Sequence, residues 1–141
     1  MSAPSALAVG HRFADTKLAI LGPDDVAAYA EASGDHNPIH LDETAARAAG
    51  LPGTIVHGML IMGRFEGAIR SWLPQADIKG LQSRFVKPLA VGDGITIGGR
   101  IARVRPLAGG DTELLVRLTI ANGAGAMICI GEAVLHLPAD G

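Results

Sequence analysis

The sequence predicts an α+β fold in which an antiparallel β-sheet packs around one long buried helix. An apolar segment with helical spacing occupies the middle of the chain, and four strand-like segments follow it with short turns between them. Turns as short as Gly109-Gly110-Asp111 and Asn122-Gly123 favour antiparallel hairpins over crossover connections. A chain of 141 residues has the size of one ordinary domain, so we expect residues 1–141 to form a single domain.

The first part of the chain predicts a strand followed by two helices. Residues 11–21 have the pattern of a short strand and a turn. A helix is expected from Pro23, which suits a first helical turn, to the stop signal at Gly34. A second, short helix is expected to begin after Asp42 as its N-cap and to end at Gly50.

The segment 58–72 predicts the central helix. Apolar side chains cover most of its circumference, and only Arg64, Glu66 and Arg70 interrupt them, so we expect a largely buried helix. The apolar positions are Met59, Leu60, Ile61, Met62, Phe65, Ala68, Ile69 and Trp72.

Strands are expected after this helix at 80–89, 95–105, 112–121 and 126–137. The third alternates with period two, and one face carries Thr112, Leu114, Val116, Leu118 and Ile120. On the second, the same alternation places Arg103 and Arg105 on the face of Ile95, Ile97 and Ile101, so these arginines are expected where that face leaves the core.

Composition excludes several classes of protein. Twelve Lys and Arg against fourteen Asp and Glu give a net charge of −2, which removes the electrostatic case for a nucleic acid or anionic membrane partner. Apolar residues make up 48% and charged residues 18%, which predicts a folded chain that shares apolar surface with another subunit. No charge-free stretch reaches the length of a bilayer span, and the N-terminus has no basic region typical of a signal peptide. We therefore expect a cytoplasmic protein.

The densest polar cluster runs from Ser33 to Asp42. Pro38 prevents one continuous helix through it, so the segment must curl and can bring Asp35 and His40 together. A carboxylate beside an imidazole suits proton transfer near neutral pH. Taken alone, this spacing is more often structural, with Asp35 in an Asx turn and His40 as a hydrogen-bonded core histidine.

The wider sequence gives this cluster a context. Gly34-Asp35-His36-Asn37-Pro38-Ile39-His40 is followed by His57-Gly58-Met59-Leu60, and later by Phe85-Val86-Lys87-Pro88-Leu89 with Gly92-Asp93. These motifs, in this order, resemble those of the MaoC-like family of (R)-specific enoyl-CoA hydratases and 3-hydroxyacyl dehydratases. The resemblance extends over about residues 10 to 137. It implies the hot-dog fold, with the sheet wrapped around the helix 58–72, and a homodimer or larger homo-oligomer joined through sheet edges.

The resemblance also implies an activity. It would be the addition of water to a trans-2-enoyl-CoA to give an (R)-3-hydroxyacyl-CoA, or the reverse dehydration, with coenzyme A or an acyl carrier protein as thioester carrier. Asp35 and His40 correspond to the catalytic dyad, and the backbone N–H of Gly58 is the candidate oxyanion donor. Asn37 and His57 are expected to support the loop. No metal or separate cofactor is implied, because coenzyme A is part of the substrate.

Two other functions remain open from the sequence. Some family members carry a serine where this chain has Glu66, and an acidic residue on the central helix drives hydrolysis in hot-dog acyl-CoA thioesterases. The alternative for Glu66 is a surface pair with Arg70 one turn later. The chain could also be a non-catalytic accessory subunit of a heterodimeric dehydratase, although such a subunit has no need of both Asp35 and His40.

Two further groups of side chains carry weaker signals. His36, His40, Asp42 and His57 have ligand chemistry, but their spacing matches no common zinc pattern. Candidates for the phosphates of coenzyme A are Arg84, Lys87, Arg100, Arg103 and Arg105, each of which is, taken singly, an ordinary surface charge.

Overall fold

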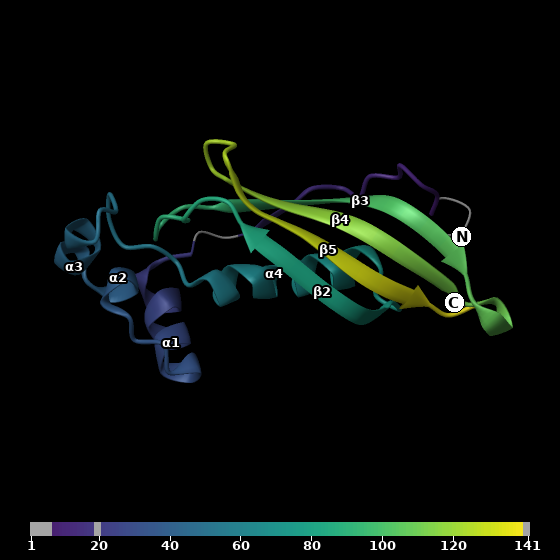
Figure 1. The fold of residues 1–141 in the computed structure, drawn as a ribbon, viewed down its shortest axis with the longest axis horizontal. Coiled ribbons are helices and arrows are strands. Elements are labelled where there is room, and N and C mark those ends of the chain that lie inside the picture. The colour runs from purple at the N-terminus through teal and green to yellow at the C-terminus, as the bar shows by residue number, and fades with distance from the viewer. Residues whose placement is uncertain (1–6, 19–20, 140–141) are drawn as a thin grey trace.

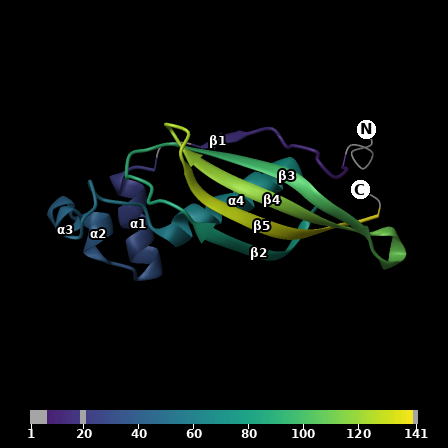
Figure 2. The same ribbon diagram turned by 45° about the horizontal axis from the view of Figure 1, so that its top comes forward.

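A five-stranded antiparallel sheet and one helix lying against its face form the body of the protein (Figure 1). The computed structural model describes residues 7–18 and 21–139. The strands lie in the order β1-β3-β4-β5-β2, so β1 and β2 are the edges. Figure 2 shows α1, α2 and α3 gathered beyond one end of the sheet. The elements are β1 (Thr16–Leu18), α1 (Pro23–Ser33), α2 (Pro38–Leu41), α3 (Glu43–Ala48), α4 (Gly58–Trp72), β2 (Asp77–Phe85), β3 (Ile95–Pro106), a 3₁₀ turn (Ala108–Gly110), β4 (Thr112–Asn122) and β5 (Met127–Leu137).

The α+β architecture, the central helix and the antiparallel hairpins are confirmed. Strand β4 is the middle of the sheet, and its predicted inner residues Leu114, Val116, Leu118 and Ile120 are buried. This face packs on α4, whose Phe65 is fully buried. Within the described residues, no helix has the length and apolar character of a membrane span.

The predicted burial of α4 around most of its circumference is wrong for the single chain. Ile61, Phe65 and Ile69 lie in the core, but Met59 is 61% exposed. The physical reason is that the sheet covers only one side of the helix (Figure 1). On the exposed side, the Nε of Arg70 donates to Glu66 at 3.0 Å, which is the surface pair that the sequence offered as an alternative.

Two strands differ in extent from their predictions. The segment 11–21 contributes only Thr16–Leu18 as a named strand, with a single bridge at Arg12, and residues 19–20 lie outside the described part. Strand β2 covers Asp77–Phe85 rather than 80–89. Leu89 is nevertheless fully buried, because its loop folds back and its carbonyl accepts a hydrogen bond from the Val56 N–H at 2.8 Å.

The prediction for Arg103 and Arg105 is wrong because β3 contains a bulge. The pairing of β3 with β4 shifts register between Ile101 and Arg103. After the shift Arg103 lies opposite Leu115 and Arg105 opposite Glu113, on the side facing away from α4. One extra residue in a strand reverses the face of every residue that follows it.

An ionic cluster forms on this outer face. Glu113 accepts hydrogen bonds from the Nε and Nη2 of Arg105 at 3.0 and 2.8 Å, and its other oxygen lies 2.9 Å from the Nε2 of His136. Hydrogen bonds from His136 and then Arg105 stabilise the carboxylate and lower the pKa of Glu113 below its ordinary value of 4.5.

Replacement of Glu113 should change the acid sensitivity of the fold. A carboxyl group whose pKa falls on folding stabilises the folded state above its unfolded pKa, and that stabilisation is lost as the pH falls through the lower folded value. The stability difference between wild type and Glu113→Gln should therefore be full above about pH 4.5 and shrink below it. Urea unfolding across this range measures it. The exposed Glu66→Gln is the matched control and should show a smaller change, while a constant difference for Glu113→Gln at every pH would contradict the assignment.

Candidate active site

The loop between α1 and α2 is curled by its own side chains. Helix α1 ends at Gly34, whose φ of +79° is the left-handed conformation that favours glycine. The Asp35 side chain then accepts from the Asn37 N–H at 3.2 Å, and the Asn37 side chain accepts from the Ile39 N–H at 3.2 Å. The sequence predicts a curled segment around Pro38 and the next helix only after Asp42, but Pro38 begins a further short helix, α2. These short-range bonds turn the chain so that Asp35 faces α2.

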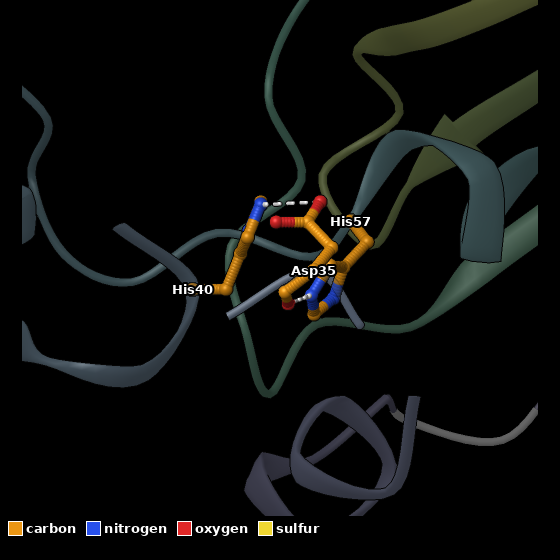
Figure 3. Close-up of side chains that lie close together, drawn as sticks. All are labelled: Asp35, His40 and His57. Carbon is orange, nitrogen blue, oxygen red and sulfur yellow. Dashed lines mark hydrogen bonds and ion pairs between the residues drawn. The ribbon is translucent and has the colours of Figure 1, made fainter. Parts of the chain in front are cut away.

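His40 projects from α2 towards Asp35. Its Nδ1 lies 2.7 Å from the carbonyl oxygen of Ile55, so Nδ1 carries the proton and donates it. In the neutral ring the Nε2 therefore keeps a free lone pair. This Nε2 lies 3.9 Å from Oδ2 of Asp35 (Figure 3), with the His40 side chain 9% exposed. The structure thus brings together the two residues that the sequence paired, at a separation too long for a direct hydrogen bond.

His57 contacts both residues of this pair. It is 1% exposed, and its Nε2 donates to the backbone carbonyl of Asp35 at 3.0 Å (Figure 3). Its ring stacks on His40 with centroids 3.9 Å apart, and Tyr29 packs on it at 4.8 Å. Among residues 7–18 and 21–139, the remaining nitrogen, Nδ1, is buried and has no hydrogen-bond partner. Through its bond to the Asp35 carbonyl, His57 ties the Asp35 loop to the start of α4, and its supporting role stays a prediction.

The N-terminus of α4 opens onto a pocket next to His40. Gly58 is the first residue of the helix, and its N-cap, His57, makes no side-chain capping bond. The pocket holds about 300 Å³ and is lined by His40 and Gly58, by Phe85 and Lys87, and by aliphatic side chains that include Ile55. A Cβ at position 58 would lie 3.1 Å from the Phe85 ring, so glycine here allows close approach.

The pocket leaves out two predicted groups. Asp35 is not part of its lining, since it lies on the more exposed side of His40 with its side chain 51% exposed. Glu66 lies on the exposed side of α4, bonded to Arg70, and is also absent from the lining.

The set of possible metal ligands that lie together in the structure differs from the set that the sequence suggests. Donor atoms of Asp35, His40 and His57 lie within 4.8 Å of one another and make a set that zinc accepts. His36 does not join them, because its Nε2 lies 3.5 Å from Glu31. Asp42 caps α3 by accepting from the Thr44 N–H at 2.9 Å, which is the N-cap that the sequence predicts.

Sequence reasoning missed three contributors to the site. The Ile55 carbonyl fixes the His40 tautomer, but any residue carries a carbonyl, so no side-chain pattern marks it. Tyr29 reaches His57 from α1, and Phe85 reaches Gly58 from β2, through contacts that only the fold creates.

Known proteins share this sequence and geometry. The model of the MaoC like domain family matches residues 6–118. An (R)-specific enoyl-CoA hydratase of Aeromonas caviae is 35% identical, covering 98% of this chain and all of the relative. A mitochondrial 3-hydroxyacyl-acyl-carrier-protein dehydratase of Arabidopsis thaliana is 35% identical over 67% of this chain, which spans 56% of that protein.

A solved structure agrees with these relatives. The (R)-hydratase from A. caviae involved in PHA biosynthesis superimposes with a TM-score of 0.82 at 32% identity, covering 94% of this chain and 98% of that one. The predicted hot-dog fold is therefore confirmed. Since the family model matches most of the chain and a relative matched over its full length is 35% identical, this chain belongs to the MaoC-like dehydratase domain family.

Proposed function

We propose that the protein catalyses the reversible (R)-specific hydration of trans-2-enoyl thioesters, with Asp35 and His40 as the catalytic dyad. The observation that carries this proposal is the free Nε2 of His40 facing Oδ2 of Asp35 at 3.9 Å, beside a pocket that also contains the N-terminus of α4. The relatives named above are hydro-lyases acting on 3-hydroxyacyl or enoyl thioesters, which supports the same reaction class.

The dyad has the geometry to hold one water molecule. A separation of 3.9 Å is too long for a direct bond, and a water beside both groups can hydrogen-bond to each. In hydration, the pair takes a proton from this water as its oxygen bonds to C3, and the pair returns one proton to C2. No proton is gained or lost overall. The Ile55 carbonyl orients the imidazole for this step by holding the proton on Nδ1.

Gly58 is the proposed oxyanion donor. During water attack, negative charge develops on the thioester carbonyl oxygen and is stabilised by N–H groups already aimed at it. The first N–H groups of a helix lack internal acceptors, and the helix dipole favours negative charge there. Gly58 begins α4 and lines the pocket next to His40, so a carbonyl in this pocket meets both.

The acyl carrier is a thioester of coenzyme A or of an acyl carrier protein. The A. caviae relative is named for an enoyl-CoA, and the A. thaliana relative for an acyl carrier protein. In this chain the pocket lining includes Lys87, the one member of the five predicted phosphate-binding candidates found there. A cytoplasmic location stays a prediction.

A direct assay tests the function. With trans-2-enoyl-CoA substrates from C4 to C16, the enoyl-thioester absorbance should fall, and the product should be the (R)-3-hydroxyacyl-CoA. Thiol release instead would indicate a thioesterase, and an (S) product would contradict the proposal.

Activity should survive exhaustive dialysis against a chelator, because acid–base groups alone activate the water. Loss restored by zinc would make Asp35, His40 and His57 a metal site.

Substitution of the dyad tests the residue assignment. Asp35→Asn and His40→Gln preserve approximate size but remove acid–base function, so each should lower kcat by ~10²–10⁴. The double variant should be far less impaired than the product of the single losses, because both groups act on one water. Steady-state kinetics with the best enoyl-CoA measures these effects.

Glu66→Gln is the matched control on α4. Its side chain is 56% exposed and absent from the pocket lining, so its replacement should change kcat less than about tenfold. Circular dichroism establishes that each variant is folded. Near-normal hydration by folded Asp35→Asn and His40→Gln would overturn the mechanism, and a large loss in Glu66→Gln would favour the thioesterase.

The minimum active unit should be a homodimer. Strand β2 is a nine-residue edge of the sheet, and the exposed side of α4 carries Met59 at 61% exposure. Pairing of such edges between copies removes unpaired backbone groups from water. Light scattering coupled to gel filtration should report at least two chains per particle, and an active, monodisperse monomer would contradict this prediction.

A further inference from the structure

A row of arginines crosses the outer face of the sheet, away from α4. Arg12 forms a β-bridge with Arg100, and Arg100 lies directly opposite Arg117 in the pairing of β3 with β4. Side chains of directly opposite residues project from the same face of a sheet. Like charges in this arrangement destabilise the sheet. Three consecutive cross-strand positions therefore concentrate positive charge on a chain whose net charge is −2.

The neighbouring carboxylates compensate only part of this charge. Glu132, the next residue in the row, lies 3.3 Å from Arg117. Across residues 7–18 and 21–139, no carboxylate lies within 4.0 Å of a guanidinium nitrogen of Arg12, Arg84 or Arg100.

These side chains surround a hollow of about 620 Å³. Its lining contains the arginines Arg12, Arg84, Arg100 and Arg117 against the acids Asp15 and Glu132, a net formal charge of +2. Thr119 adds a hydroxyl group to the same lining. A hollow of this volume falls within the range of small-molecule sites.

The hollow and the His40 pocket have no lining residue in common. On β4, Arg117 and Thr119 alternate with the buried Val116 and Leu118, so they project from the side of the sheet opposite the core. Of the predicted phosphate-binding candidates, Arg84 and Arg100 lie here, whereas Lys87 lies in the pocket next to His40.

We propose that this outer hollow binds a small molecule containing a diphosphate group. The guanidinium fork matches phosphate oxygens in a two-point hydrogen bond, and adjacent forks suit adjacent phosphates. A charge of about −2 or more on the ligand offsets the net charge of the lining and removes the repulsion within the arginine row. A free nucleoside diphosphate and the diphosphate of a coenzyme A molecule both supply this chemistry. The proposal does not depend on the hydratase assignment.

Calorimetric titration of the full chain with inorganic pyrophosphate tests the site. We expect saturable binding at one site per chain in 0.15 M salt. Arg100→Gln should weaken it by about tenfold or more, since charge-assisted bonds to phosphate are lost. Arg103→Gln is the matched control, an exposed arginine on the same strand outside the hollow, and should change affinity less than about twofold. Glu132→Gln should tighten binding, because it removes a negative charge from the lining.

The design separates binding from misfolding. Arg100→Gln relieves like-charge repulsion, so its thermal stability without pyrophosphate should equal or exceed that of the wild type. Parallel titrations with ADP and coenzyme A identify the source, and competition of either with pyrophosphate supports the site. Absence of saturable pyrophosphate binding overturns the proposal, as does equal weakening by Arg103→Gln. Effects of Arg100→Gln confined to an acidic carrier protein would overturn it in favour of a protein-docking face.

Discussion

The packing of α4 against one face of the sheet is the constraint on which the rest of the structure depends. Phe65 is fully buried beneath β5, where a Cβ at Gly131 would lie 3.1 Å from its ring. Glycine at that position lets the helix approach the sheet closely, and burial of Phe65, Ile61 and Ile69 supplies several kcal/mol in total, at about 1.5–3 kcal/mol for each large side chain. The helix axis is thereby fixed, and so is the direction in which its N-terminus points.

The candidate active site is assembled at that fixed N-terminus. His57, as N-cap of α4, holds the carbonyl of Asp35, and the segment just before it supplies the carbonyl that orients His40. The first bond joins the Asp35 loop to the segment that leads into α4, and the second joins α2 to the same segment. The catalytic candidates are therefore positioned by the helix that the core holds, although neither belongs to it.

The sequence was sufficient for the features that depend on local pattern. Alternation along 112–121, the N-cap at Asp42 and the glycine stop at position 34 predict elements that the structure reproduces within a few residues. It failed where a single residue changes register. The bulge after Ile101 leaves no mark in composition, yet it moves Arg103 to the opposite face. The sequence predicts that the loop brings Asp35 and His40 together, but the tautomer of His40 depends on a backbone atom fifteen positions away.

Ile55 has two separate tasks in this arrangement. Its carbonyl accepts from Nδ1 of His40, while the residue also lines the pocket next to that ring. The carbonyl is present whatever the residue type, so the orientation of the imidazole does not depend on the side chain at this position. Under the proposed function, exchange of one aliphatic group for another here would change the acyl pocket and leave the orientation of the imidazole intact. Backbone acceptors make a catalytic centre tolerant of the variation through which new substrates are acquired.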